Sequence, residues 1–147
     1  MRTSQEQSQI SGALGHRVRH KDALGKRGEA FAAEFYRARG AQVIAANVRY
    51  QVGEIDLIVR EPEGTIVFVE VKTRASAQYG VAEAVTPRKL ARMRKAAVQW
   101  LEGKPLSTVR FDVLALVARG KGQVQPSTNP GSEFDMEYYQ GVDHGAW

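Results

Sequence analysis

The segment Ile66–Lys72, with the sequence IVFVEVK, constrains the fold of this 147-residue chain more than any other. Its apolar residues follow one another without alternation, which is typical of a central strand that is covered on both faces. Glu70 and Lys72 interrupt the run. Burying a carboxylate and an ammonium group is costly unless the two are paired or bind an ion. The segment therefore predicts both a central strand and a polar site within it.

Apolar periodicity and turn residues divide the rest of the chain into further elements. A helix is predicted from a cap at Asp22 to about Arg39, with Gly40 as its stop, and a second helix from Thr86-Pro87 to about Leu101. The other predicted strands are Gln42–Tyr50, Glu54–Arg60, Thr108–Val117 and an edge strand at Phe134–Gln140. The order α-β-β-β-α-β predicts an α/β fold whose mixed central sheet is flanked by helices.

Two connections set the strand directions in this sheet. Glu61-Pro62-Glu63-Gly64 is a turn signal, so Glu54–Arg60 and Ile66–Thr73 should form an antiparallel hairpin. The second helix then leads to Thr108–Val117, and a strand–helix–strand unit predicts that this strand runs parallel to Ile66–Thr73.

Composition bounds the domain organisation and the cellular setting. We expect a basic, flexible arm at residues 1–21 and a single domain at residues 22–147, with a mobile loop at 118–132 that is rich in Gly, Pro, Gln and Ser. The chain has no cysteine, no secretory h-region and no apolar run of membrane-spanning length. These features predict a cytoplasmic protein without a membrane segment and exclude disulfide and thiolate chemistry.

The formal net charge of +5 is unevenly distributed. Residues 1–21 contain four basic residues against Glu6, and residues 86–104 contain six against Glu102. Two basic segments thus flank a mildly acidic body, which suits a polyanion such as nucleic acid. The alternative is a solvated helix face and an unstructured tail.

Strand alternation predicts where the polar residues meet. Glu54, Asp56 and Ile58 should share one face of their strand, while Glu70 and Lys72 share a face with Ile66 and Phe68 of the next. In a hairpin, Asp56 and Glu70 can then lie close together, with Lys72 one pleat beyond. The alternative is a charge cluster at exposed strand ends, in which Lys72 is simply paired with Glu70 or Asp56.

This set of residues suits phosphodiester hydrolysis with Mg²⁺ or Mn²⁺ as cofactor. Asp56, Glu70 and the backbone carbonyl of Val71 can supply hard oxygen ligands. The metal would polarise the phosphate and lower the pKa of a bound water, while Lys72 orients that water or stabilises developing charge. Glu29, which flanks the apolar stripe of the first helix, is a further candidate ligand or base; the alternative is an ordinary helical glutamate.

The second helix carries the candidate contacts to nucleic acid. Arg88, Arg92 and Lys95 recur at i, i+4 and i+7, Lys89 belongs to the same basic segment, and Gln78 follows the Glu70–Lys72 strand. We find no base-reading motif, so we expect the protein to recognise the structure of a nucleic acid rather than its sequence. The expected nucleic acid is DNA rather than RNA.

Several motifs together resemble a known family. They are Gly25-Lys26-Arg27-Gly28-Glu29-Ala30, Asn47-Val48-Arg49, Gly53-Glu54-Ile55-Asp56-Leu57-Ile58, Val67-Phe68-Val69-Glu70-Val71-Lys72-Thr73-Arg74 and Arg110-Phe111-Asp112-Val113. The pattern resembles the PD-(D/E)xK nuclease superfamily, which has the restriction-endonuclease-like fold, and within it the small bacterial proteins of the YraN type. These are distantly similar to archaeal Holliday-junction resolvases.

The resemblance implies a catalytic set of Glu29, Asp56, Glu70 and Lys72. Because resolvases of this fold are commonly dimeric, it also implies that this chain can form a homodimer. Asp112 fits the family pattern, but we expect it to bond to neighbouring backbone rather than to act in catalysis.

Three hypotheses follow from the sequence. The first is a Mg²⁺- or Mn²⁺-dependent endonuclease acting on branched or structured DNA. The second is a nucleic-acid-binding protein of the same fold with little or no catalysis, and the third is an interaction protein whose carboxylate cluster is structural.

Overall fold

The order of elements along the chain matches the predicted order. The structure, a computed structural model, describes residues 23–76, 86–119 and 133–142. Its elements are a helix at residues 23–38, β1 (Gln42–Tyr50), β2 (Gly53–Arg60), β3 (Ile66–Arg74), α2 (Pro87–Leu101), β4 (Val109–Ala118) and β5 (Phe134–Tyr139). The predicted strand at the C-terminal end, Phe134–Gln140, is thus confirmed as β5.

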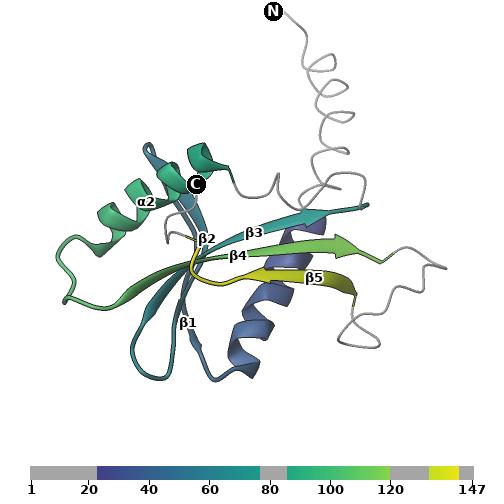
Figure 1. The fold of residues 1–147 in the computed structure, drawn as a ribbon, viewed down its shortest axis with the longest axis horizontal. Coiled ribbons are helices and arrows are strands. Elements are labelled where there is room, and N and C mark those ends of the chain that lie inside the picture. Colours follow the sequence, from purple (N-terminus) through teal and green to yellow (C-terminus); the bar gives the residue numbers. More distant parts are fainter. Residues whose placement is uncertain (1–22, 77–85, 120–132, 143–147) are drawn as a thin grey trace, which may run out of the picture.

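The strands form one mixed sheet in the order β1-β2-β3-β4-β5 (Figure 1). β1 with β2, β2 with β3 and β4 with β5 are antiparallel pairs, whereas β3 and β4 are parallel. The crossover through α2 joins the parallel pair, as the strand–helix–strand pattern predicts. β3 is therefore the central strand that the IVFVEVK run indicates.

Local signals place the ends of these elements. Thr86 caps α2 by accepting the Lys89 N–H at 3.2 Å, and Pro87 follows as the first helical residue. Gly40 has a φ of 89° just after the 23–38 helix, and Gly64 has a φ of 103° in the turn between β2 and β3. Glycine is favoured at both positions because residues that carry a side chain rarely adopt positive φ.

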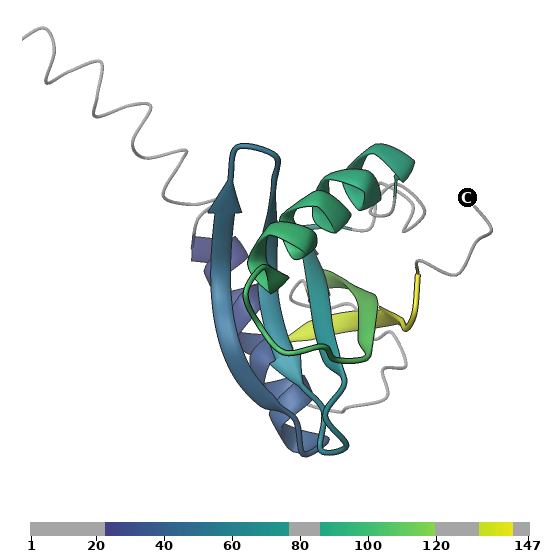
Figure 2. The same ribbon diagram turned by 90° about the vertical axis from the view of Figure 1, so that its left-hand side faces the viewer.

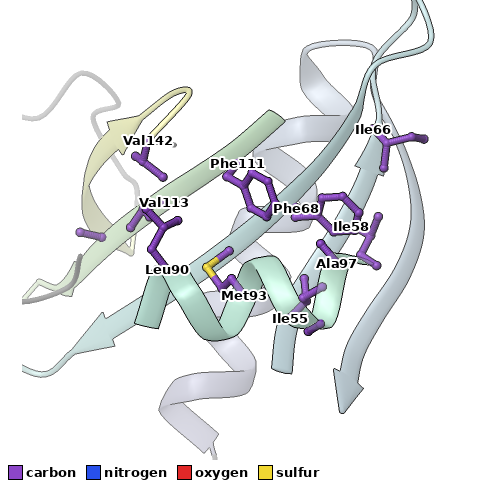
Figure 3. Packing of buried hydrophobic residues seen from close by; sticks show 12 residues of the cluster. Ile55, Ile58, Ile66, Phe68, Leu90, Met93, Ala97, Phe111, Val113 and Val142 are labelled. Carbon is purple, nitrogen blue, oxygen red and sulfur yellow. The ribbon is translucent and has the colours of Figure 1, made fainter. Parts of the chain in front are cut away.

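Each face of the sheet is covered by one helix, which Figures 1 and 2 show from two sides. α2 covers one face, and Figure 3 shows its Leu90, Met93 and Ala97 against residues of β2, β3 and β4. The 23–38 helix covers the other face with Ala32 and Tyr36. The core on this second side comprises Ala32, Tyr36, Ala41, Leu57, Val59, Val67, Val69 and Leu114.

Strict alternation fails at one point in β2. Leu57 and Val59 face the 23–38 helix, and Ile58 faces α2, as expected. Ile55, however, packs with Ile58 in the α2 cluster instead of with Leu57 (Figure 3). The regular alternation predicted for β2, with Glu54, Asp56 and Ile58 on one face, was therefore wrong at this point, since the alternation is broken at Asp56, between Ile55 and Leu57.

This mixed sheet between two helices is an α/β arrangement consistent with a restriction-endonuclease-like fold. The predicted arm at 1–21, Gln78 and all but the first two residues of the predicted 118–132 loop lie outside the described residues. Ala118 is the last residue of β4. Within the described ranges, no helix has the length and apolar character needed to cross a membrane.

Candidate functional site

The candidate site begins where β2 and β3 separate. Their regular pairing ends at Leu57 opposite Val69. Beyond that pair, the Val71 N–H donates to the Asp56 carboxylate at 2.8 Å. The side chain of Asp56 thus occupies the gap between the strands. The Val71 carbonyl points toward the same gap, because N–H and C=O of one residue in an extended strand point to the same side.

Glu70 lies directly beside Asp56. The two carboxyl groups are close enough to perturb each other's ionisation. Burial, and then the charge of Asp56, raise the pKa of Glu70 to about 8. Burial also raises the pKa of Asp56, against the bond from Val71. The predicted proximity of Asp56 and Glu70 is therefore present.

Two lysines approach this pair from different elements. Lys89 of α2 places its Nζ 3.8 Å from Glu70 Oε1. Within the described residues no ion pair joins Lys72 to Asp56 or Glu70, so the simple pairing considered for Lys72 is not found. Burial, followed by the charges of Lys89 and Arg74, lowers the pKa of Lys72.

Lys72 instead lines an open groove of about 580 Å³. Glu29 of the 23–38 helix lines the same groove, whose residues are Leu24, Gly25, Glu29, Val71, Lys72, Thr73, Arg74, Ala75 and Ser76. The 23–38 helix approaches β3 closely here, since a Cβ on Gly28 would overlap the side chain of Thr73. Because Gly28 has no side chain, the helix can lie close to β3, and this places the neighbouring Glu29 at the groove.

Glu29 is also held from β1. The side chain of Asn47 lines the same hollow as Glu29. Burial raises the pKa of Glu29, although the nearby Asn47 side chain acts to lower it. The negative charge of Asp56 acts in the same direction as burial. Glu29 and Asp56 both line a small hollow of about 80 Å³, together with Asn47, Val48, Arg49, Glu54 and Ile55. The structure thus brings Glu29 to the same rim as Asp56.

The donor set fits a small, hard divalent ion. Asp56 and Glu70 offer adjacent carboxylate oxygens, and the Val71 carbonyl faces the same gap. Mg²⁺ commonly takes only one or two carboxylates and completes its shell with water and phosphate oxygens. The described residues contain no group of three or more His, Cys, Asp or Glu side chains arranged to hold a metal. A site here would consequently depend on two carboxylates, as the sequence predicts.

The predicted nucleic-acid residues divide into two groups. Arg88, Arg92 and Lys95 are exposed on α2, which begins beside the site. Lys89 is half-buried and pairs with Glu70, so it does not belong to the exposed group of Arg88, Arg92 and Lys95. Gln78 lies outside the described residues.

Asp112 lies at the centre of a separate buried network. It is fully buried and accepts hydrogen bonds from Tyr36 at 2.8 Å and Tyr138 at 2.9 Å, and from the Gly141 N–H at 3.0 Å. Arg110 donates to Asp112 and to Glu61. The predicted bond to neighbouring backbone is present, but most partners are side chains, which the sequence analysis did not foresee.

The sequence analysis did not assign two residues, Lys89 and Asn47, to the site. Lys89 was placed with the phosphate contacts, because only the crossing of α2 over the sheet brings it to Glu70. Asn47 was noted only as part of a motif, yet it is the one non-glycine residue with positive φ in the described chain, at 53°. An asparagine within a strand pattern is a usable signal, because it tolerates this conformation better than most residues.

The comparisons with known proteins concern the same residues. Residues 28–116, which include Glu29, Asp56, Glu70 and Lys72, match the model of the Uncharacterised protein family UPF0102. A UPF0102 protein of Corynebacterium diphtheriae is 45% identical over 127 residues, covering 86% of this chain and 96% of that protein. One from Frankia casuarinae is 49% identical over 116 residues, covering 77% and 92%. The chain therefore belongs to the UPF0102 family, the YraN-like family that its motifs indicated.

Proposed function

We propose that this chain is a Mg²⁺- or Mn²⁺-dependent endonuclease that hydrolyses phosphodiester bonds in DNA, with branched or otherwise structured DNA as its substrate. The observation that carries the proposal is the contact between the Asp56 and Glu70 carboxyl groups at the gap between β2 and β3. Two touching carboxyl groups do not both ionise readily without a cation between them. A divalent ion provides that charge.

Each residue has a role in the proposed reaction. Asp56, Glu70 and the Val71 carbonyl would hold the ion, which when bound would polarise the phosphate and lower the pKa of a water molecule. Lys72 holds the attacking water or pairs with the charge that develops on the phosphate. Glu29 accepts a proton from that water, and its raised pKa suits this task.

The bond changes balance without further reactants. The water oxygen forms a bond to phosphorus, and the bond from phosphorus to the leaving ester oxygen breaks. The proton of the water passes to Glu29, and the leaving oxygen takes a proton from solvent. The open groove between Glu29 and Lys72 has room for a phosphate of the backbone.

Binding would come from the exposed side of α2. Arg88, Arg92 and Lys95 lie along it and contact phosphates rather than bases, so recognition depends on the shape of the DNA. The distant resemblance to junction resolvases supports a branched substrate and a homodimeric enzyme.

The test uses purified protein with a four-way DNA junction and with linear DNA, in Mn²⁺, in Mg²⁺ and with chelator. We expect metal-dependent cleavage that falls at least ~100-fold in Glu70→Ala and in Lys72→Ala, while DNA binding is retained. Glu34→Ala, on the exposed side of the 23–38 helix, is the matched control and should cleave normally. Equal cleavage by all of these proteins would reveal a contaminating nuclease.

A second candidate function is DNA binding without catalysis. One observation favours it: the described residues contain no group of three or more His, Cys, Asp or Glu side chains that could hold a metal. Binding of the junction without cleavage in any of several metals would support this candidate over the first. If the protein also fails to bind DNA at low salt, both are wrong, and the carboxyl pair is a structural feature of an interaction protein.

A further inference from the structure

Among the described residues, Lys89 is the cation that forms an ion pair with the carboxyl pair, although the family motif points to Lys72. Its Nζ lies 3.8 Å from Glu70 Oε1. This separation exceeds the 2.7–3.2 Å of a good N–H···O hydrogen bond, so the two groups are paired by charge and held loosely. The Lys89 side chain is 42% exposed, whereas that of Glu70 is 15% exposed. The lysine is therefore the more solvent-accessible partner of the two.

The backbone of Lys89 is fixed more firmly than its side chain. Lys89 lies in the first turn of α2, where its N–H donates to the Thr86 cap. About one turn further on, α2 touches the start of β2 so closely that a Cβ on Gly53 would overlap the Arg92 carbonyl. Figure 2 shows α2 lying across the sheet at this end. Only the side chain of Lys89 can move appreciably.

The position of Lys89 is unfavourable for the helix itself. The first turn of α2 contains no acidic residue, while both Arg88 and Lys89 are basic. Positive charge at a helix N-terminus opposes the helix dipole. The Asp56–Glu70 pair, whose two members both feel the charge of Lys89, supplies the compensating negative charge. Lys89 therefore belongs to the site rather than to the exposed stripe of Arg92 and Lys95.

We propose that the Lys89 ammonium group neutralises the Asp56–Glu70 pair in the metal-free protein, and that a divalent cation displaces it so that it pairs with a phosphate of bound DNA. This inference rests on the proposed function, because it assumes that Asp56 and Glu70 hold a metal. A part-exposed ion pair contributes little, on the order of a fivefold change in an equilibrium constant. A divalent ion that contacts both carboxylates directly can therefore replace the ammonium group.

The first test measures Mn²⁺ binding by isothermal titration calorimetry, without DNA. Lys89→Gln removes the competing charge and should bind Mn²⁺ about fivefold more tightly than the wild type. Lys89→Arg keeps the charge and should bind as the wild type does. Lys95→Gln, two turns along the exposed side of α2, controls for the loss of one positive charge and should leave Mn²⁺ affinity unchanged.

The second test asks where Lys89 goes after displacement. In a Lys72→Ala background, which prevents cleavage, junction binding is measured by fluorescence anisotropy at several salt concentrations. With Mn²⁺, Lys89→Gln should reduce the slope of log affinity against log salt by about one unit; with chelator it should have no effect. Lys95→Gln should reduce the slope equally in both conditions if it contacts a phosphate.

The outcomes separate the two proposals. If the wild type binds Mn²⁺ but Lys89→Gln binds it equally or more weakly, Lys89 is no competitor and the inference is overturned, while the proposed function stands. A salt slope that is independent of metal in Lys89→Gln would also overturn it. If neither protein binds Mn²⁺ at millimolar concentration, the metal site itself is wrong, and both proposals fail.

Discussion

A single asparagine is held in an unusual backbone conformation beside the site. Asn47 lies within β1 with a φ of 53°, between Ala46, which pairs with Leu57, and Val48, which pairs with Ile55. Asp56 lies across from it, at the point where the pleat of β2 is interrupted. Such strain persists where the surrounding structure enforces it, and it is common at functional sites. At Asn47 it occurs in the residue that lines the same hollow as Glu29 and Asp56.

Substitutions at Asn47 should separate its backbone from its side chain. Asn47→Gly accepts positive φ and should change the free energy of unfolding by less than about 1 kcal/mol. Asn47→Val does not accept it and should destabilise the protein by about 1–2 kcal/mol. Chemical denaturation measures both. Equal stability of the two variants would show that the backbone at this position relaxes freely.

At Glu70, burial beside Asp56 makes stability depend on pH. Its pKa is about 8 in the folded protein and near the ordinary 4.5 when unfolded, so the folded state holds the proton more tightly. This contribution is complete below pH 4.5 and is lost as the pH rises toward 8. In chelator, the melting temperature should fall between pH 5.5 and 8.5, and it should fall less in Glu70→Gln. Identical pH profiles for the two proteins would contradict this.

Among the elements, the 23–38 helix and β3 meet at a contact that depends on one glycine. A Cβ on Gly28 would overlap Thr73, whereas a Cβ on Gly25, one turn earlier in the same helix, would meet nothing within 4 Å. The helix therefore rests on β3 at Gly28, directly before Glu29. The position of that carboxylate is set by this contact between elements.

The two glycines give a matched pair of substitutions. Gly28→Ala should destabilise the protein by about 1–3 kcal/mol, because the helix must move away from β3. Gly25→Ala should be neutral or stabilise by up to ~1 kcal/mol, because alanine is the better helix former. Thermal unfolding followed by circular dichroism distinguishes them. A similar effect of both substitutions would mean that the close approach at Thr73 is unimportant.

The boundaries of the elements were largely predictable from the sequence, and the exact site was not. Thr86-Pro87, Gly40 and the 61–64 turn are local signals, and each fixes the end of an element within a residue or two. The failures concern long-range geometry. The interruption at Asp56 depends on where the β2–β3 pairing ends, and the placement of Lys89 depends on how α2 crosses the sheet.

At the scale of the whole molecule, the buried network around Asp112 joins distant parts of the chain. It connects β4 to the 23–38 helix through Tyr36, to β5 through Tyr138 and to the backbone at Gly141. Arg110 extends it to Glu61 at the end of β2. Burial raises the pKa of Tyr138 to about 12, so its hydroxyl keeps its proton and donates at neutral pH. Sequence patterns within single elements do not predict such a network.

Breaking this network should affect global stability rather than the site. Asp112→Ala leaves the Arg110 charge without its main partner and should cost about 3–5 kcal/mol. Asp135→Ala removes a more exposed ion pair, with Arg119, and should cost at most about 1 kcal/mol. Denaturant unfolding of both variants tests the difference. A small effect at Asp112 would mean that the network is dispensable for the fold.

The irregular backbone of β1 has a consequence for how copies of the molecule avoid one another. β1 is an outermost strand, so its outer row of N–H and C=O groups has no neighbouring strand in the described sheet. The register shifts between Val43 and Ala45, and the positive φ of Asn47 bends the backbone again. An exposed strand with two such kinks is a poor template for adding a further chain. The distortion of β1 beside the site thus also protects this border against edge-to-edge aggregation.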